Sequence, residues 1–261
     1  MAKSNLKTDN LRDLLIFSGG IVLLLNKIVK ETVKGKIYWR LLSEQLTIIG
    51  WRSLPLIIIT AISTGMVMSL QYGLGLEKFG GKLYVPKLVA VTILREMGPV
   101  FTALMIAARV GAGIASEIGS MTVTQQIDAI RALGTSPIKV IVIPRVLACL
   151  IALPLLVALA NLVGNAGGLW VGASELKLDP HFYYQKVVTT VDLYDYLSGM
   201  FKTFFFSLFI TIPACYYGLN VKSGTKEVGQ ATTRAVVMAS ILILVGDYFL
   251  SKLFWVLEKW A

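Results

Sequence analysis

Long apolar runs alternate with short charged segments along the chain. Residues 53–76, 146–174 and 203–221 contain no charged side chain. A helix rises about 1.5 Å per residue, so about 20 apolar residues cross a hydrocarbon core of about 30 Å. The three charge-free runs therefore predict membrane-spanning helices.

Two further apolar stretches contain isolated charges. Lys87–Ser116 is interrupted by Arg95, Glu96 and Arg109, and Ala235–Leu257 contains Asp247 in its middle. With these included, the pattern predicts an all-α membrane protein with five transmembrane helices. The predicted spans are residues 53–76, 87–116, 142–172, 198–221 and 235–257.

Three of the runs carry small residues at every fourth position. Such rows let helix backbones approach closely in lipid, where apolar burial supplies no attraction between helices. They predict tight packing within the bundle, and a seam between two copies of the chain is a second reading compatible with the first. The rows are Ala61, Gly65, Ser69 and Gly73; Ala107, Gly111, Ala115 and Gly119; and Ala160, Gly164, Gly168 and Gly172.

The first 50 residues are predicted to form helices that lie in the membrane interface. Leu14–Leu25 is apolar but too short to span comfortably, and no small-residue cleavage site of a signal peptide follows it. An uncleaved membrane anchor is the alternative. Lys27–Arg40 alternates apolar and cationic residues, as a helix lying on a membrane surface does.

Basic residues are divided unequally between the two sides of the predicted bundle, and the formal net charge is +10. With the N-terminus in the cytosol, sixteen Lys and Arg residues fall on the cytosolic side and seven on the outer side. The positive-inside rule favours this orientation, which makes the C-terminus periplasmic. Attraction to anionic leaflet lipid, about 1 kcal/mol per cation, explains the basic composition without a nucleic-acid partner.

Residues 117–137, between the second and third predicted spans, are too polar to cross a membrane. Their apolar positions recur at helical spacing, and Gly134 and Pro137 follow as helix-ending residues. The segment is predicted to be a cytosolic coupling helix on which a partner docks. Its candidate docking residues are Glu117, Gln126, Asp128 and Arg131.

Residues 173–197 are predicted to form a periplasmic loop that carries the single histidine, His181. One histidine without a second nitrogen ligand gives no support for a metal site, and Cys149 and Cys215 lie in separate apolar runs without metal-type spacing. The sequence has no G-x-x-x-x-G-K-[ST] phosphate loop, H-E-x-x-H helix or G-x-S-x-G elbow. Neither a cofactor nor catalysis by this chain alone is therefore expected.

Ionisable residues inside the predicted spans are the best candidates for chemistry. On an insertion scale each costs roughly 2.5 to 3.5 kcal/mol if it faces lipid at mid-membrane, so each is expected to face protein, water or an opposite charge. The candidates chosen are Arg109 and four residues whose charges sum to zero, which predicts a network between the second, fourth and fifth spans. Its members are Arg95, Glu96, Lys202 and Asp247.

Adjacent residues on a helix do not face each other, so Arg95 and Glu96 are expected to have different partners. Two roles for the network stay open. It could merely hold the bundle together, or it could couple helix motion to cargo release or headgroup binding.

Three motifs of the chain resemble those of MlaE-type permeases of lipid ABC transporters. They are Leu94–Val100 (L-R-E-M-G-P-V), Ala107–Gly111 (A-A-R-V-G) and Glu117–Met121 (E-I-G-S-M). The resemblance covers nearly everything after residue 50. It continues through Pro144-Arg145, Leu153–Leu156, the row Gly164–Gly172, and Gly229–Val237.

The resemblance implies a single permease domain over residues 1–261 that works as a homodimer in the inner membrane. It also implies a separate ABC ATPase, which in this family can carry a STAS-domain partner, and a periplasmic ring of MCE-domain proteins. The cargo would be phospholipid exchanged with the outer membrane, whose lipid asymmetry is thereby maintained.

The resemblance also assigns residues to the lipid path. The positions that match its cavity lining are Met68, Leu76, Phe79 and Met97, and the four residues of the predicted network match charged positions of the family. Residues 78–82 contain extra glycine and lysine, which departs from the family pattern around Phe79.

Two other classes of function stay open from the residues themselves. Glu96 and Asp247 could carry protons in a proton-coupled secondary transporter, or act as acid or base in a membrane-embedded, lipid-modifying enzyme. A co-purifying ATPase and ATP-dependent lipid movement would separate the permease from both.

Overall fold

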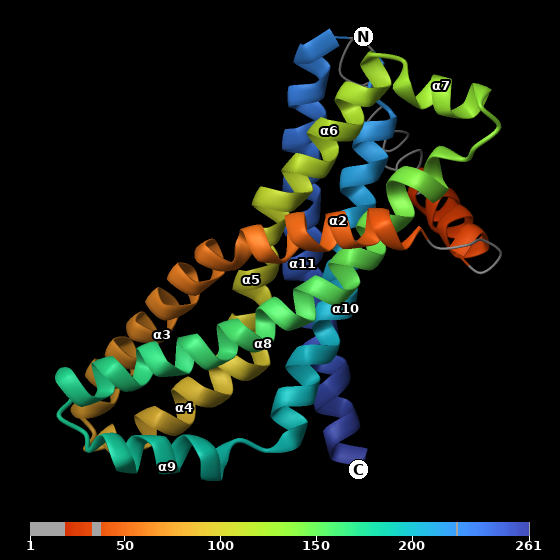
Figure 1. Ribbon diagram of the computed structural model, residues 1–261. Helices are drawn as coiled ribbons and strands as arrows, with labels where there is room; N and C mark the ends of the chain where they lie inside the picture. The colour runs from red at the N-terminus through yellow and green to blue at the C-terminus, as the bar shows by residue number, and fades with distance from the viewer. Residues whose placement is uncertain (1–18, 33–37, 223, 261) are drawn as a thin grey trace, which may run out of the picture.

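The computed structural model describes residues 19–32, 38–222 and 224–260, and within these ranges every regular element is a helix (Figure 1). The first helical segment covers residues 19–32. The others are α2 (Trp39–Ile49), η1 (Trp51–Ser53), α3 (Leu54–Glu77), η2 (Lys82–Tyr84), α4 (Val85–Thr92), η3 (Ile93–Met97), α5 (Gly98–Ile106), η4 (Ala107–Gly111), α6 (Ala112–Val123), α7 (Gln126–Ala132), η5 (Ile138–Val142), α8 (Ile143–Ser174), α9 (Pro180–Thr190), α10 (Leu193–Leu219) and α11 (Gly224–Trp260).

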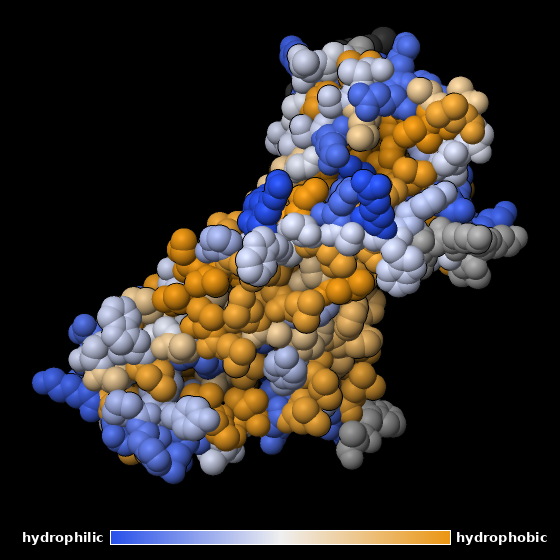
Figure 2. Space-filling model, viewed as in Figure 1, coloured by the Kyte–Doolittle hydropathy of each residue, from blue (hydrophilic) through white to orange (hydrophobic). Residues whose placement is uncertain are grey.

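Five continuous helical stretches in the described part of the chain are long and apolar enough to cross a membrane, which confirms the predicted number. They are Trp39–Glu77, Lys82–Val123, Ile138–Ser174, Leu193–Leu219 and Gly224–Lys259. On the face shown in Figure 2, apolar residues cover the middle of the molecule and polar residues gather toward its two ends. Residues 19–32 and α7 lie toward one end, and α9 and the end of α11 lie at the other (Figure 1).

The second span is a composite helix in which α4, α5 and α6 are joined by two π-helical turns, η3 and η4. Single π-turns inside α-helices are rare and occur frequently at functional sites. Here the two turns hold the three charged residues in the middle of the span, because η3 contains Arg95 and Glu96 and η4 contains Arg109.

The first and third spans pack directly against each other through their small-residue rows. A Cβ added at Gly65 would lie 1.8 Å from the carbonyl oxygen of Gly164, and one at Gly167 would lie 2.6 Å from that of Ile62. Only glycine permits this approach. The rows therefore serve packing within one chain, as the first reading predicted, while the homodimer seam stays a prediction.

The segment predicted as an outer loop, residues 173–197, contains the helix α9. Asp179 caps this helix by accepting a hydrogen bond from the backbone N–H of Phe182 at 2.8 Å, and Pro180 follows as its first residue. Both are start signals for a helix. Asp192 and Asp195 then form a capping box at the start of α10, so the fourth span begins earlier than predicted.

The segment 117–137, predicted as one coupling helix, contains parts of two helices in the structure. Its first part continues the second span as α6, which ends at Val123, and its second part is α7. The left-handed backbone of Gln125 (φ 59°) separates them, and Gly134 (φ 73°) follows α7. The hydrophobic periodicity continues across the break at Gln125, so the sequence pattern does not predict it.

The N-terminal prediction is tested only in part. Residues 1–18 and 33–37 lie outside the described ranges, and with them part of Leu14–Leu25 and of Lys27–Arg40. Residues 19–32 form a helix that buries Leu24 and Ile28 against the bundle and leaves Val22 and Leu23 63% exposed. The buried and exposed apolar positions lie on different faces of this helix.

Candidate intramembrane charged site

The site begins with a proline in the second span. Pro99 has no N–H, so the carbonyl of Arg95 loses the donor that a helix normally supplies from four residues further on. The N–H of Gly98 bonds to the carbonyl of Ile93, which closes the π-turn η3. The Arg95 carbonyl instead accepts a hydrogen bond from Nζ of Lys202 at 3.1 Å.

Lys202 on α10 joins three spans. Its side chain is 2% exposed, and its ammonium donates to Oε2 of Glu96 at 2.6 Å, Oδ1 of Asp247 at 2.9 Å and Oγ of Ser251 at 2.7 Å. Ser251 also lies 3.1 Å from Oε1 of Glu96. Three N–H groups thus share four acceptors, and the charge of the buried ammonium is compensated on two sides.

A glycine lets α10 come close enough for this contact. A Cβ at Gly199 would lie 2.1 Å from the carbonyl oxygen of Leu94, so the backbone of α10 rests on the π-turn. Lys202 is three residues further along the same face of α10. The glycine and the lysine therefore act together: one permits the approach and the other satisfies the carbonyl that the proline left free.

Arg95 points to a different set of partners, as expected from its place next to Glu96. Its Nε donates to Asp195 on α10, and its Nη2 lies 3.4 Å from Oε1 of Glu258 on α11. The guanidinium also lies 5.9 Å from the ring centroid of Tyr194. Arg95 and Glu96 thereby connect the second span to α10 and α11 through two separate groups of side chains.

Three residues of this network were missed in the sequence: Asp195, Ser251 and Glu258. Asp247, Ser251 and Glu258 are separated by four and seven residues, so they share one face of α11, and this spacing could have pointed to them. Asp195 was assigned to a loop, which hid its spacing of seven residues from Lys202. The roles of all these residues in transport stay predictions.

The four positions assigned to the lipid path lie on the first span, just after it, and in the second span. Met68 and Leu76 lie on α3 and pack against a buried apolar cluster that includes Val89. Phe79 follows α3 and is 85% exposed, and Met97 ends η3 and lines a small cavity against α3. Their grouping around one lipid stays a prediction.

The four candidate docking residues have unequal surroundings. Asp128 and Arg131 form an exposed ion pair on α7 at 2.9 Å, and Gln126 is the exposed first residue of that helix. Glu117 on α6 instead pairs at 2.8 Å with Arg145.

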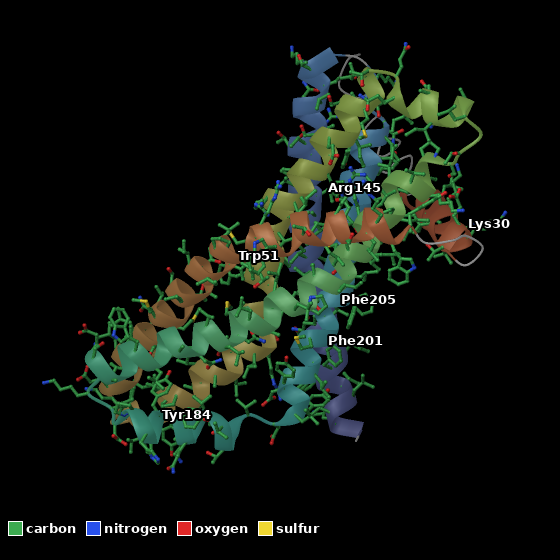
Figure 3. The ribbon with its side chains drawn as sticks, viewed as in Figure 1. Lys30, Trp51, Arg145, Tyr184, Phe201 and Phe205 are labelled. Atoms are coloured by element: carbon green, nitrogen blue, oxygen red, sulfur yellow. The ribbon has the colours of Figure 1, made fainter. Side chains whose placement is uncertain are left out.

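Arg145 lies on the first turn of α8 (Figure 3) and is 4% exposed. It also donates to the carbonyl of Ile141 at 2.8 Å. The ion pair between Glu117 and Arg145 therefore joins the second span to the third, while the Glu117 side chain stays half exposed.

No group of three or more His, Cys, Asp or Glu side chains in the described ranges is placed to hold a metal ion. His181 lies on the exposed first turn of α9. Cys149 and Cys215 are buried free thiols.

Comparison with known proteins gives consistent matches over most of the chain. A family model described as "Permease MlaE" matches residues 42–253. A probable ABC transporter permease protein of Rickettsia conorii is 39% identical over 226 residues, which is 87% of each chain. The intermembrane phospholipid transport system permease protein MlaE of Haemophilus influenzae is 33% identical over 217 residues, 83% of each chain. The chloroplast protein TRIGALACTOSYLDIACYLGLYCEROL 1 of Arabidopsis thaliana is 31% identical over 234 residues, 90% of this chain and 67% of its own.

Proposed function

Because the chain belongs to the MlaE permease family, we propose that it is the membrane subunit of an ABC transporter that moves phospholipid between the inner membrane and periplasmic carriers. Exchange with the outer membrane would then maintain lipid asymmetry there. The observation that supports this most is the family match over residues 42–253, together with five spans and a charged network among three of them. The name of the Haemophilus relative points to phospholipid as cargo.

The energy source is a separate ATPase subunit, which in this family can carry a STAS-domain partner. The chain has no phosphate loop of its own. Its exposed helix α7, with Gln126, Asp128 and Arg131, is the docking element. The basic residues cluster at the same end, and the positive-inside rule supports an orientation with that end and the N-terminus in the cytosol and the C-terminus in the periplasm.

The working unit is a homodimer. Apolar side chains stay exposed along α3, among them Ile59 at 66%, and along α11, among them Phe249 at 63%. A second copy would cover much of this surface, and Met68, Leu76, Phe79 and Met97 would then face a lipid path between the two subunits. A ring of MCE-domain proteins would receive the lipid on the periplasmic side.

The charged network links this path to the rest of the bundle. Glu96 and Met97 are neighbours on η3, so a movement of the π-turn moves both. Lys202 and Asp247 fix the turn relative to α10 and α11. A shift of these two helices would therefore change the position of Met97 in the path.

Purification in mild detergent tests the proposal at the level of subunits. We expect an ABC ATPase to co-purify in a fixed ratio, and ATP hydrolysis by that complex to respond to phospholipid. If no ATPase co-purifies, and lipid movement follows a proton gradient rather than ATP, the chain is a secondary transporter. Chemically altered lipid would identify an enzyme instead.

A further inference from the structure

We propose that the chain holds a second lipid site, at the basic end of the bundle, for one anionic phospholipid of the cytosolic leaflet. A cavity of about 910 Å³ lies there between residues 19–32, the end of α7 and the end of α10. It is separate from α3 and from the charged network. The proposal rests on the topology proposed above, in which this end is cytosolic.

One face of the N-terminal helix forms the first wall of the cavity. Gly20, Leu23, Lys27 and Lys30 line it at spacings of three or four residues, so they lie on one side of the helix. The lining is apolar near the start of this helix and cationic near its end. Gly20 seats the helix, because a Cβ there would lie 2.4 Å from the ring of Tyr216.

The opposite wall comes from two distant segments. Ile138 and Leu219 supply apolar surface, and Arg131 and Asn220 supply polar groups. The cavity therefore offers apolar contacts and positive charge together. A phospholipid with an anionic headgroup has this combination, whereas a soluble anion would use only the cations. Basic pockets between helices on the cytosolic side of membrane proteins bind such headgroups.

The balance of charge in the lining is positive. Lys27, Lys30 and Arg131 face a single carboxylate, that of Glu31, which leaves two positive charges in excess. Among the described residues neither lysine has an acidic partner. Arg131 is paired with Asp128, which is not part of the lining.

The carboxylate of Glu31 accepts a hydrogen bond from across the cavity. Oγ of Ser136 donates to Oε1 of Glu31 at 2.7 Å, which ties the N-terminal helix to the segment after α7. The same contact keeps the two walls together. A phospholipid bound between Lys27 and Arg131 would add a second link across the cavity, close to the docking helix.

The test measures lipid retention by the purified complex without ATP, so its result does not depend on transport. The complex is titrated with phosphatidylglycerol or phosphatidylcholine in detergent, and bound lipid is counted by native mass spectrometry. The double variant K27Q/K30Q should bind phosphatidylglycerol about 30-fold more weakly, which is about 2 kcal/mol at 1.4 kcal/mol per tenfold change. Binding of phosphatidylcholine should be weak in the unchanged protein and in the double variant.

The variant K222Q/K226Q is the matched control, because it removes two exposed cations near the same end that do not line the cavity. It should bind phosphatidylglycerol within about twofold of the unchanged protein. If phosphatidylglycerol binding fell equally in both double variants, the lipid would be responding to the general surface potential, and the proposed site would be excluded.

Two further results would also contradict the proposal. Glycerol phosphate binding as tightly as phosphatidylglycerol would define an anion site without a lipid. Binding of phosphatidylglycerol only after the ATPase subunit has been stripped from the complex would make the cavity a protein-docking surface. In addition, L23Q should weaken phosphatidylglycerol binding but not glycerol phosphate binding, and equal effects on both would exclude an acyl-chain contact at Leu23.

Discussion

At the residue scale, the intramembrane site is organised around a backbone carbonyl without its helical donor. Pro99 removes the donor, and Lys202 replaces it from another helix. A side-chain ammonium is well suited to this because it has three N–H groups, so the bond to the carbonyl leaves others for Glu96 and Asp247. One lysine thereby satisfies a backbone group and compensates two carboxylates.

Lys202→Met should destabilise the protein by about 3 kcal/mol, since it leaves two carboxylates and one carbonyl without their donor inside the membrane. The value lies at the low end for a buried pair because the side chain of Glu96 is 35% exposed. Thermal unfolding in detergent measures the loss.

The triple variant E96Q/K202M/D247N is its control. It removes the charges together and should recover part of the lost stability. An unchanged melting temperature in Lys202→Met would show that its four contacts contribute nothing to stability.

Asp247→Asn separates the two roles that the sequence left open for the network. The amide keeps the size of the side chain but removes its charge, so Lys202 retains only Glu96 as an ionic partner. If the network couples helix motion to cargo release, lipid transport should fall at least tenfold at a normal protein level. Transport at the unchanged rate would assign the network to bundle stability alone.

At the scale of elements, glycine contacts and helix breaks determine how the spans fit together. The charge-free runs predicted the spans because lipid imposes a minimum apolar length. Their ends were harder to predict, because a helix can continue beyond the apolar run into water as a polar helix: α6 runs to Val123 and α11 starts at Gly224. The break at Gln125 was missed because the apolar period runs across it.

Gly65→Ala should destabilise the contact of α3 with α8 by about 1 to 3 kcal/mol, because the new Cβ would meet the Gly164 carbonyl at 1.8 Å. Gly75→Ala is the matched control on the same helix, where nothing lies within 4 Å of the added Cβ. Thermal unfolding should show a lower melting temperature for Gly65→Ala only. Equal melting temperatures of the two variants would show that α3 and α8 can move apart to accommodate the new Cβ without loss of stability.

Substitutions of Glu117 and Arg131 should affect different properties, although both residues were predicted to dock the ATPase. Arg131→Glu changes an exposed pair on α7, so it should weaken ATPase docking at an unchanged melting temperature. Glu117→Gln leaves the buried Arg145 without its ionic partner, so it should also lower stability, by about 1 to 3 kcal/mol. Pull-down with the ATPase subunit and thermal unfolding give the two readouts. ATPase docking that survives Arg131→Glu would exclude α7 as the docking element.

At the scale of the whole molecule, much of the candidate site could be predicted because charges inside a membrane are few and must find partners. Arg95, Glu96, Lys202 and Asp247 were identified from their positions in apolar runs. Their pairing required the three-dimensional arrangement, since it depends on a π-turn and on the close approach at Gly199. Asp195, Ser251 and Glu258 were missed because two lie near span ends and serine carries no charge.

We propose that the five spans of this chain, as a dimer, form a lipid path that an ATPase docked on α7 drives. Each part of that account has its counterpart in the structure: exposed apolar faces on α3 and α11, an exposed α7, and a network that ties η3 to the last two spans. The parts act together only if ATP hydrolysis at one end moves lipid at the other.

The most direct test is transfer of fluorescent phospholipid between vesicles and a periplasmic carrier by the reconstituted complex. We predict transfer that requires both this chain and ATP, and that falls at least tenfold in Asp247→Asn while ATPase subunits remain bound. Transfer at the same rate without ATP, or none with every subunit present, would contradict the account.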